Sequence, residues 1–416
     1  MKIEKNVLNE ALRVLGKVVW QTSPEVVLRS VRFFGTPGNV RVMATDGTEV
    51  VSLAVDAECE GDVDFCVEHR ELREMVRIGK GALEIDGSKV EYPTLAVAPE
   101  DAVSVALPKD FCSLLALAAP IVDRQEARPA LQGINLSRDG VTATNGRELL
   151  NLPCPLDLNE DFTLPFPLAL LTAKLDEPGT LQIWREKDCR YFRMEIGRFI
   201  WIGKAQPGTF PNWKQVVPVP QSLDYSVTIH EVARVIDFLK TVPDHPPFHG
   251  IELNVTTDGV SVISNGQPNM KLDVAADHVG RTPRAVLALN KHVLQRMLTQ
   301  GYKTFRANAD GRIPVVAEGG HGKYIAMPIH ILPKQKIQSK NNQENQKMEE
   351  IKPEVTLSPL DELNSNVEEL RGKLKTLFDE SGTLLRKVKE ATLQQKQKER
   401  EFIQAKRAIE RIKMAI

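Results

Sequence analysis

The sequence predicts an α+β protein in which three tandem domains, each with two helices packed on antiparallel sheets, precede an α-helical coiled coil. Three observations predict it: a β-hairpin pattern that recurs at domain-sized intervals, amphipathic helix patterns around each hairpin, and a heptad repeat confined to the end of the chain. A chain of 416 residues is long enough for about three domains of roughly 100 to 150 residues each.

The clearest hairpin pattern runs through residues 131–150. Two β-rich runs flank Asp139-Gly140, and Asn145-Gly146 follows them. Asn and Gly tolerate the positive φ that tight hairpin turns require. Similar patterns end at Gly47 and at Gly266, which lie 99 residues before and 120 residues after Gly146. This spacing favours three copies of one domain over a short solenoid repeat.

Helix and strand patterns alternate around these hairpins. Helices are predicted over residues 7–19, 69–80, 111–120, 167–174, from residue 229, and after an N-cap at Asn290. Further strands are predicted over residues 82–85, 89–92, 180–184, 191–195 and 199–202. We therefore expect domains at residues 1–104, 105–221 and 222–332, each built from two similar halves.

Beyond residue 332 the composition changes. Residues 333–359 are polar and predict a flexible linker. Residues 360–416 carry apolar side chains at heptad spacing, in one set of Leu360, Val367, Leu374, Val388, Phe402 and Ile409 and a second of Leu363, Leu370, Leu377, Leu384, Ala391, Ala405 and Ile412. A helix of this length would extend about 85 Å and favours a coiled coil. A helical hairpin that turns near Gly382 is the alternative.

Composition and motifs limit the function classes. The five cysteines are scattered and form no CxxC pair, which argues against a metal or redox site. The spacing of His245 and His249 is compatible with a metal, but we expect no cluster of cysteines or carboxylates beside them, and therefore no metal and no cofactor. No phosphate-binding loop, His-Glu-x-x-His or Gly-x-Ser-x-Gly motif is present, and we expect no catalysis. No signal-peptide pattern or apolar run of about 18 residues occurs, which predicts a cytoplasmic, nucleoid-associated protein with no membrane partner.

Four runs, in order and at matching spacing, resemble one protein family. They are Arg128-Pro129-Ala130-Leu131-Gln132-Gly133, Ala143-Thr144-Asn145-Gly146-Arg147, the stretch from Phe199 through Gly208-Thr209-Phe210-Pro211 to Pro218, and Tyr324-Ile325-Ala326-Met327-Pro328-Ile329-His330-Ile331. Residues 1–331 thereby resemble the β subunit of bacterial DNA polymerase III, the β sliding clamp. Residues 332–416 lie outside the family's pattern.

The resemblance implies a ring of two head-to-tail protomers whose helices line a hole around double-stranded DNA. It also implies a non-catalytic scaffold that tethers the DNA polymerase III catalytic subunit, the clamp loader and other clamp-binding proteins, and so confers processivity. Their short peptides would insert apolar residues into a pocket between the second and third domains. That pocket would be lined by Arg128, Leu131, Thr144, Gly146, Leu149, Pro211, Val216, Phe248, Ile325, Met327, Pro328 and Ile329.

For DNA, a clamp needs phosphate contacts that are independent of base sequence. Arg70, Arg73, Arg77 and Lys80 are spaced so that they share one helix face and are the first candidates. Further candidates are Arg13, Lys17, Arg124, Gln125, Arg234, Lys240, Lys291 and Arg296. Bulk charge does not favour DNA, because residues 1–332 contain 41 acidic and 36 basic side chains, whereas the remainder contains 14 acidic and 18 basic ones.

Several positions depart from the family's pattern. Glu148, Gln215 and His330 stand where the family typically has arginine, which predicts a less basic pocket with altered partner peptides. Ser23 stands where family members often carry an arginine for DNA. A second hypothesis therefore remains open: a clamp-derived interaction protein, assembled through its coiled coil, that binds replication or repair partners without encircling DNA. The coiled coil could pair with itself or with another protein.

Overall fold

The structure is a computed structural model, and it describes residues 1–93, 97–244, 249–265, 267–319 and 321–329. The described residues belong to one compact unit, residues 1–334. The predicted linker at 333–359, the predicted coiled coil at 360–416 and the alternative hairpin near Gly382 lie outside the described residues.

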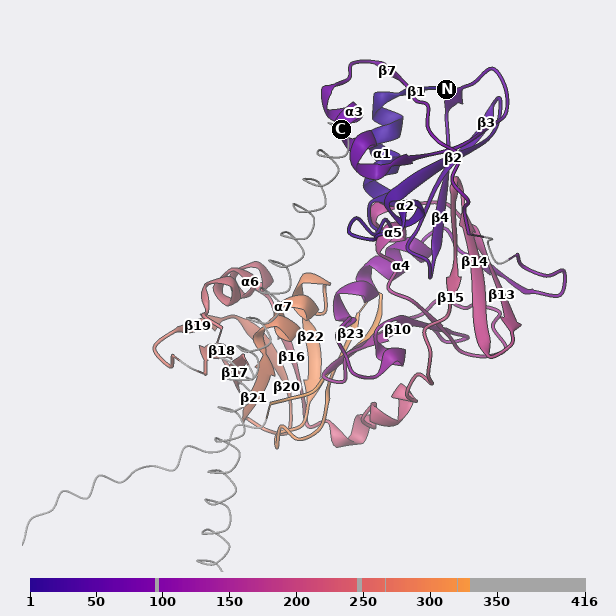
Figure 1. Cartoon of the computed structure of the whole chain (residues 1–416). Helices are drawn as coiled ribbons and strands as arrows, with labels where there is room; N and C mark the ends of the chain where they lie inside the picture. Colours follow the sequence, from indigo (N-terminus) through magenta and orange to yellow (C-terminus); the bar gives the residue numbers. More distant parts are fainter. Residues whose placement is uncertain (94–96, 245–248, 266, 320, 330–416) are drawn as a thin grey trace, which may run out of the picture. The chain divides into compact units, whose positions relative to one another are not determined.

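Within the described part, one order of elements recurs three times (Figure 1). The first repeat consists of β1 Lys2–Glu4, α1 Lys5–Leu15, α2 Val26–Arg29, β2 Ser30–Thr36, β3 Asn39–Thr45, β4 Val50–Val55, β5 Ala57–Glu58, β6 Val63–Glu68, α3 His69–Ile78 and β7 Ala82–Glu84. A strand leads into a helix, then come antiparallel strands, a second helix and further strands. The order of helix, strands, helix and strands is the one that the sequence predicted for each domain, and the leading strand was not predicted.

The second repeat follows the same order. It consists of β8 Val103–Leu107, α4 Phe111–Ala118, β9 Ile134–Ser137, β10 Gly140–Thr144, β11 Glu148–Leu152, β12 Phe162–Leu164, α5 Leu168–Ala173, β13 Gly179–Glu186, β14 Cys189–Ile196 and β15 Phe199–Lys204. Short 3-10 helices occur at Ala119–Ile121, Pro129–Leu131, Trp213–Val216 and Pro220–Ser222. The predicted hairpin is present, and Gly140 has a φ of +130° in its first turn.

The third repeat completes the described part. It consists of β16 Tyr225–Ile229, α6 Val232–Thr241, β17 Gly250–Thr256, β18 Gly259–Ser264, β19 Lys271–Val274, β20 Ala276–Gly280, β21 Arg284–Asn290, α7 Lys291–Thr299, β22 Thr304–Ala307, β23 Val315–Gly319 and β24 Gly322–Ala326. Asn290 caps α7 as predicted, because its side-chain oxygen accepts hydrogen bonds from the backbone N–H groups of His292 and Val293.

Two large antiparallel sheets each continue from one repeat into the next. An eight-stranded sheet has the order β6-β2-β3-β4-β15-β14-β13-β8, and a nine-stranded sheet has the order β12-β9-β10-β11-β24-β23-β22-β16-β20. The first to second junction is the β4–β15 pair, with Val51 opposite Trp201. The second to third junction is the β11–β24 pair, with Leu150 opposite Tyr324. Successive repeats are therefore joined by backbone hydrogen bonds as well as by the chain.

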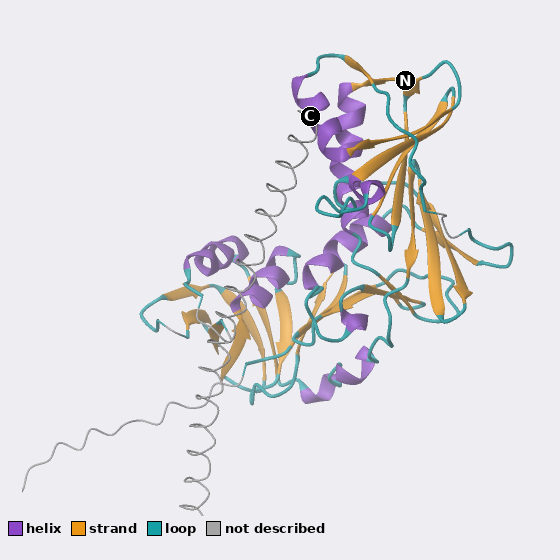
Figure 2. Cartoon of the chain, viewed as in Figure 1, coloured by secondary structure: helices purple, strands orange, loops and turns teal. Residues whose placement is uncertain are grey.

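The helices pack in pairs beside these sheets (Figure 2). Helix α1 contacts α3 and α5, α4 contacts α5, and α6 contacts α7. Helix α1 buries Leu8, Leu12 and Leu15 while Arg13 remains exposed, as its apolar spacing predicts. Helix α1 thus supplies an apolar face to the core and leaves a polar face outside.

One predicted hairpin is wrong. The sequence predicted strands at residues 82–85 and 89–92 around Asp86-Gly87, but β7 pairs with β1, and residues 89–92 form no strand. Ser88 instead makes an isolated bridge to Cys66 within β6. The guanidinium of Arg32 lies over the Tyr92 ring, 5.2 Å from its centre. Tertiary contacts with β2 and β6 therefore decide the path of this segment.

Candidate functional site

A cavity of about 260 Å³ lies where the second and third repeats meet. Its lining includes three buried apolar side chains, Leu131, Leu149 and Ile325. The large apolar side chains of Val216 and Met327 also line it and are 50% and 43% exposed. The cavity therefore combines a buried apolar base with accessible apolar edges, which suits a small number of inserted apolar side chains.

Nine of the twelve residues predicted for a peptide pocket line this single cavity. They are Arg128, Leu131, Thr144, Gly146, Leu149, Pro211, Val216, Ile325 and Met327. Pro328 and Ile329 follow β24 but are not part of the lining, since the Ile329 N–H donates to the carbonyl of Ala288 on β21. Phe248, together with His330, lies outside the described residues.

Three lining residues were missed by the prediction, Arg147, Asn212 and Trp213, and a fourth, Glu148, was expected at the pocket only as a departure from the family's pattern. Their positions in the sequence could have identified them, because each lies inside a run that carries the family resemblance or directly after one. Gln215, by contrast, does not line the cavity.

The turn between β10 and β11 presents one wall of the cavity. The Thr144 hydroxyl donates to the Glu148 carbonyl over 2.7 Å, and Asn145 Oδ1 accepts from the N–H groups of Arg147 and Glu148. Gly146 has a φ of +80°, and a Cβ there would stand 3.1 Å from the guanidinium of Arg128. A larger residue at Gly146 would therefore strain the turn and crowd Arg128.

Glu148 lines the pocket as a buried residue, and its carboxylate accepts hydrogen bonds from three side chains. The donors are Arg296, through Nη2 at 2.5 Å and Nε at 3.2 Å, Asn145 Nδ2 at 3.0 Å, and the Tyr324 hydroxyl. The Glu148 side chain is fully buried, whereas that of Arg296 is 27% exposed. Burial, followed by the charge of Glu148, raises the pKa of Tyr324 well above its usual range, so its hydroxyl stays a hydrogen-bond donor.

This network changes the expected charge of the pocket. The negative charge of Glu148 is compensated by Arg296, so it is not free to repel a ligand. Arg128 and Arg147 line the same cavity and are exposed, with Arg128 paired to Glu126. The accessible charges of the lining are thus positive, despite the glutamate at position 148.

Larger cavities exist elsewhere. One of about 500 Å³ in the second repeat is lined by charged and polar groups, including Asp161, Arg190 and Lys204. It contains none of the residues predicted for a peptide pocket. Size alone therefore does not mark the candidate site; the convergence of the predicted residues on one apolar cavity does.

The candidate DNA contacts fall into two groups. Arg70, Arg73 and Arg77 are exposed on α3, and Lys80 is exposed just beyond its end. Arg13 lies exposed on α1, Lys17 lies after it, and Arg124 and Gln125 are exposed in a loop of the second repeat. The guanidinium of Arg124 rests over the Phe166 ring. These groups are accessible to a polyanion.

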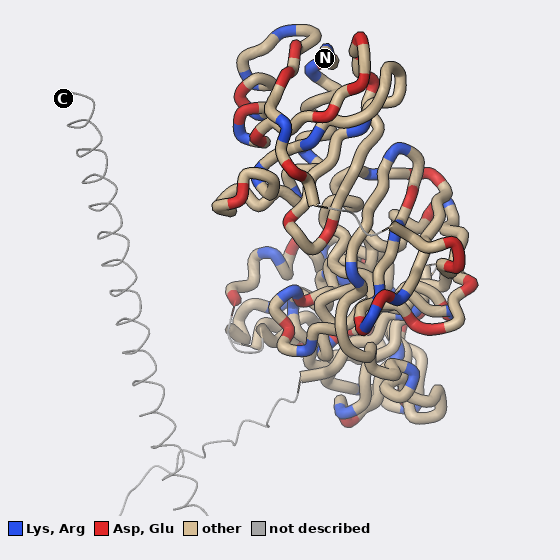
Figure 3. Tube along the Cα trace, turned by 45° about the vertical axis from the view of Figure 1, so that its right-hand side comes forward, with Lys and Arg blue, Asp and Glu red and all other residues tan. Residues whose placement is uncertain are grey.

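Other candidates are held by carboxylates. Arg234 pairs with Glu231, Lys240 with Asp237, and Arg296 with Glu148. Arg77 of the exposed group also pairs with Glu74. Basic and acidic residues are also interspersed along the chain trace (Figure 3). Lys291 was a wrong candidate, because it is only 6% exposed and its ammonium group donates to the Val242 carbonyl. Ser23, at the expected position of an arginine, is buried.

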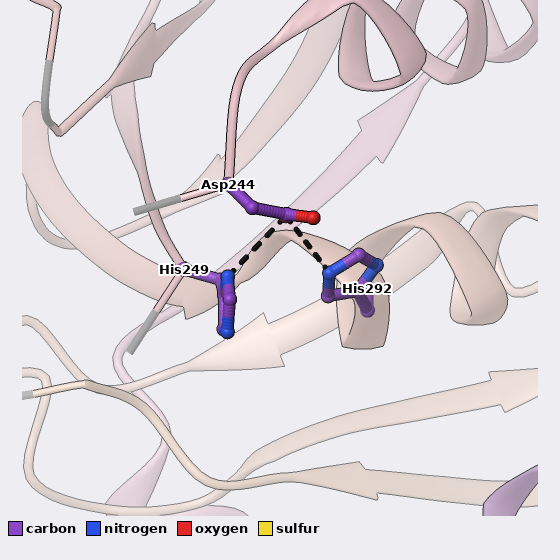
Figure 4. A group of neighbouring side chains, drawn as sticks. All are labelled: Asp244, His249 and His292. Carbon is purple, nitrogen blue, oxygen red and sulfur yellow. Dashed lines mark hydrogen bonds and ion pairs between the residues drawn. The ribbon is translucent and has the colours of Figure 1, made fainter. Parts of the chain in front are cut away.

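A cluster of Asp244, His249 and His292 in the third repeat brings three metal-ligating atoms within 4.8 Å of one another (Figure 4). Asp244 Oδ1 lies 2.7 Å from the Lys291 ammonium and 3.1 Å from His292 Nε2. Lys291, followed by the two histidines, lowers the pKa of Asp244. Because Lys291 already takes the place of a cation beside the carboxylate, ion pairing accounts for the cluster. His245 lies outside the described residues.

The chain is similar to known proteins in structure, whereas the sequence comparisons found no match. No protein-family model matches the chain, and no curated protein matches its sequence. The DNA polymerase sliding clamp from Pseudomonas aeruginosa with ligand aligns with a TM-score of 0.65 at 17% identity, over 80% of this chain and 99% of that chain. The DNA polymerase III subunit beta sliding clamp from Bartonella birtlesii, bound to griselimycin, aligns with a TM-score of 0.67 at 16% identity, over 80% and 99%.

A putative DNA polymerase III beta subunit from Eubacterium rectale aligns with a TM-score of 0.63 at 13% identity, over 79% of this chain and 99% of that chain. The chain has the sliding-clamp fold. The match extends over nearly the full length of each solved clamp, so all three repeats belong to the fold. This confirms the α+β clamp architecture that the sequence resemblance implied.

Among the described residues, no helix of the sliding-clamp fold is long and apolar enough to cross a membrane.

Proposed function

We propose that this chain is a DNA sliding clamp: two copies form a head-to-tail ring around duplex DNA and tether a replicative polymerase and other factors through the pocket at the second junction. The pocket carries the proposal. Nine residues taken from motifs far apart in the sequence line one apolar cavity in a chain of sliding-clamp fold.

The pocket is suited to a short peptide with apolar anchors. Burying apolar area against Leu131, Leu149 and Ile325 contributes about 25 cal/mol per Å². Arg128 and Arg147 would favour a peptide with a carboxylate near its anchors. We therefore expect peptides of the DNA polymerase III catalytic subunit, the clamp loader or other clamp-binding proteins to bind here.

Strand pairing supports assembly of a ring. β4 and β11 each pair with the last strand of the next repeat, β15 and β24. β19 occupies the corresponding position in the third repeat and lies at the edge of its own sheet, in the order β19-β18-β17-β21. An edge strand presents unpaired backbone groups, and a second copy of the chain could satisfy them.

Retention on DNA tests the proposal. Full-length protein is loaded with its clamp loader onto nicked circular DNA, challenged at about 0.2 M salt, where open electrostatic contacts weaken steeply, and then linearised. A topological clamp stays on the circle and leaves the linear ends. Comparable salt-resistant retention on linear DNA, or no retention on circles after verified loading, would exclude an encircling clamp.

A second candidate function is a coiled-coil interaction protein that binds replication or repair partners without encircling DNA. One observation favours it. Arg234 and Arg296 are held by carboxylates. Under this alternative, pocket peptides bind although retention on circular DNA fails.

The role of residues 360–416 in either function is open to a direct test. Light scattering of the full chain, compared with a chain that stops at residue 334, measures whether the predicted coiled coil adds protomers. Unchanged mass would instead favour a coiled-coil partner from another protein.

A further inference from the structure

The β3–β4 and β10–β11 turns have the same hydrogen-bond pattern. In the first, the Thr45 hydroxyl donates to the Glu49 carbonyl over 2.7 Å, and Asp46 Oδ1 accepts from the Glu49 N–H. In the second, the Thr144 hydroxyl donates to the Glu148 carbonyl over 2.7 Å, and Asn145 Oδ1 accepts from the Glu148 N–H. Each turn therefore places a glutamate at the same position, just before or at the start of the strand that joins the next repeat.

Both glutamates reach across a junction to an aromatic hydrogen-bond donor. Glu49 accepts from Trp201 Nε1 over 2.6 Å, and Glu148 accepts from the Tyr324 hydroxyl. The register is also the same. Trp201 pairs with the residue two positions after Glu49, and Tyr324 with the residue two positions after Glu148. The same contact is thus built twice, once at each junction inside the chain.

The two copies differ in charge compensation. Arg296 forms a close ion pair with Glu148. No Lys or Arg of the described residues forms an ion pair with Glu49, whose side chain lines a cavity of about 370 Å³. Asp46 of the same turn, Arg124 of the following repeat's loop and Lys204 of β15 are the charged groups around it. Burial, followed by the charge of Asp46, raises the pKa of Glu49 to about 7.

We propose that Glu49 and Glu148 are fasteners, that is, side chains whose hydrogen bonds stabilise the junctions between successive repeats. The Glu49 fastener is proton-sensitive: it stabilises the β4–β15 pair more when protonated than when ionised. Ionisation places a negative charge in a largely buried junction, where desolvation and Asp46 disfavour it, and the Trp201 hydrogen bond and the charge of Arg124 offset only part of that cost. The Glu148 fastener is an ion pair and serves as an internal reference. The third repeat has Pro268 at the corresponding position, so its turn supplies no carboxylate. The device is confined to junctions within one chain.

Trp201 provides the test. Its fluorescence is followed from pH 5.5 to 8.5 in a full-length chain in which Trp20, Trp184 and Trp213 are phenylalanine, with Glu49→Gln as the uncharged variant of the same shape. We expect an emission change with a midpoint near pH 7 that Glu49→Gln abolishes. An equal titration in the Glu49→Gln chain, or a flat profile in the chain that retains Glu49, would overturn the proposal.

Hydrogen exchange in the otherwise unaltered chain separates a junction effect from a local change in fluorescence. After correction for intrinsic rates, the β4–β15 amides are expected to open several-fold more often at pH 8 than at pH 6, while the β11–β24 amides keep a constant ratio. Glu49→Gln should remove the first difference. Equal pH dependence at both junctions would refute a role specific to Glu49, even if a tryptophan variant were poorly folded.

Discussion

The Glu148 network makes a quantitative prediction. Glu148→Ala removes the acceptor of two Arg296 N–H groups, of the Asn145 side-chain amide and of the Tyr324 hydroxyl, and leaves a guanidinium with no carboxylate. Breaking a buried ion pair in this way costs about 3–5 kcal/mol. Because the Arg296 side chain is 27% exposed, water can solvate part of the freed charge, and we expect a loss of about 3 kcal/mol at the second junction.

The assay is native-state hydrogen exchange at the β11–β24 ladder, including the Met327 N–H that donates to the Arg147 carbonyl. A loss of 3 kcal/mol accelerates opening by roughly 100-fold, since 1.4 kcal/mol corresponds to a factor of ten. Arg296→Met combined with Glu148→Gln is the matched control, because no uncompensated charge remains, and it should recover much of the loss. An acceleration below about fivefold in Glu148→Ala, or one that is equal at β4–β15, would refute the reasoning.

Three further predictions follow from the same structure. The pKa of Glu49 in the folded chain is about 7, against an ordinary value of 4.5, so the unfolded chain loses this proton at lower pH. The free energy of unfolding should therefore fall by at most about 3 kcal/mol between pH 4.5 and 7 and then level off. Urea titrations of the Glu49→Gln chain should lack this pH dependence. Arg73→Ala should lower the slope of log binding constant against log salt concentration for duplex DNA by about 0.9. Arg185→Ala, an exposed control on β13, should leave that slope unchanged. Equal slopes in the two variants would show that α3 is not part of the DNA-binding surface. Met327→Ala should lower the affinity for a pocket peptide about fivefold, because a partly exposed apolar contact is lost, in a titration followed by fluorescence. Val279→Ala, which alters an exposed side chain on β20, is the control. An equal loss of affinity in both variants would show that the peptide binds elsewhere.

Local patterns were sufficient for most elements. The alternation and Gly turns of residues 131–150 predict β9, β10 and β11, and the apolar spacing of α1 and α7 predicts which side chains are buried. The segment at 89–92 was misread because its alternating pattern suits a strand, while contacts with Arg32 and Cys66 hold it elsewhere. Periodicity reports local preference, and a short segment with competing partners is decided by tertiary contacts.

The pocket could be predicted only through resemblance. Leu131, Leu149 and Ile325 are ordinary core residues by pattern, and nothing in their spacing brings residues 131 and 325 together. Trp213 was missed although it stands within a matching run. Arg296 has the sequence signature of an exposed helix cation, yet its partner is Glu148, 148 positions earlier in the chain. An ion pair between residues remote in the chain produces no local sequence pattern from which it could be predicted.

The sequence by itself determined the repeated architecture of this protein, because hydrophobic periodicity and turn chemistry act over a few residues and recur three times. It also predicts, in residues 360–416, a coiled coil from heptad spacing alone. The tertiary structure decided which charged side chains are ion-paired and which are accessible. It buries Glu148 against Arg296, leaves Glu49 with a tryptophan in place of a cation, and leaves β19 at a sheet edge. These properties depend on distances between residues remote in the chain, which set desolvation and charge compensation.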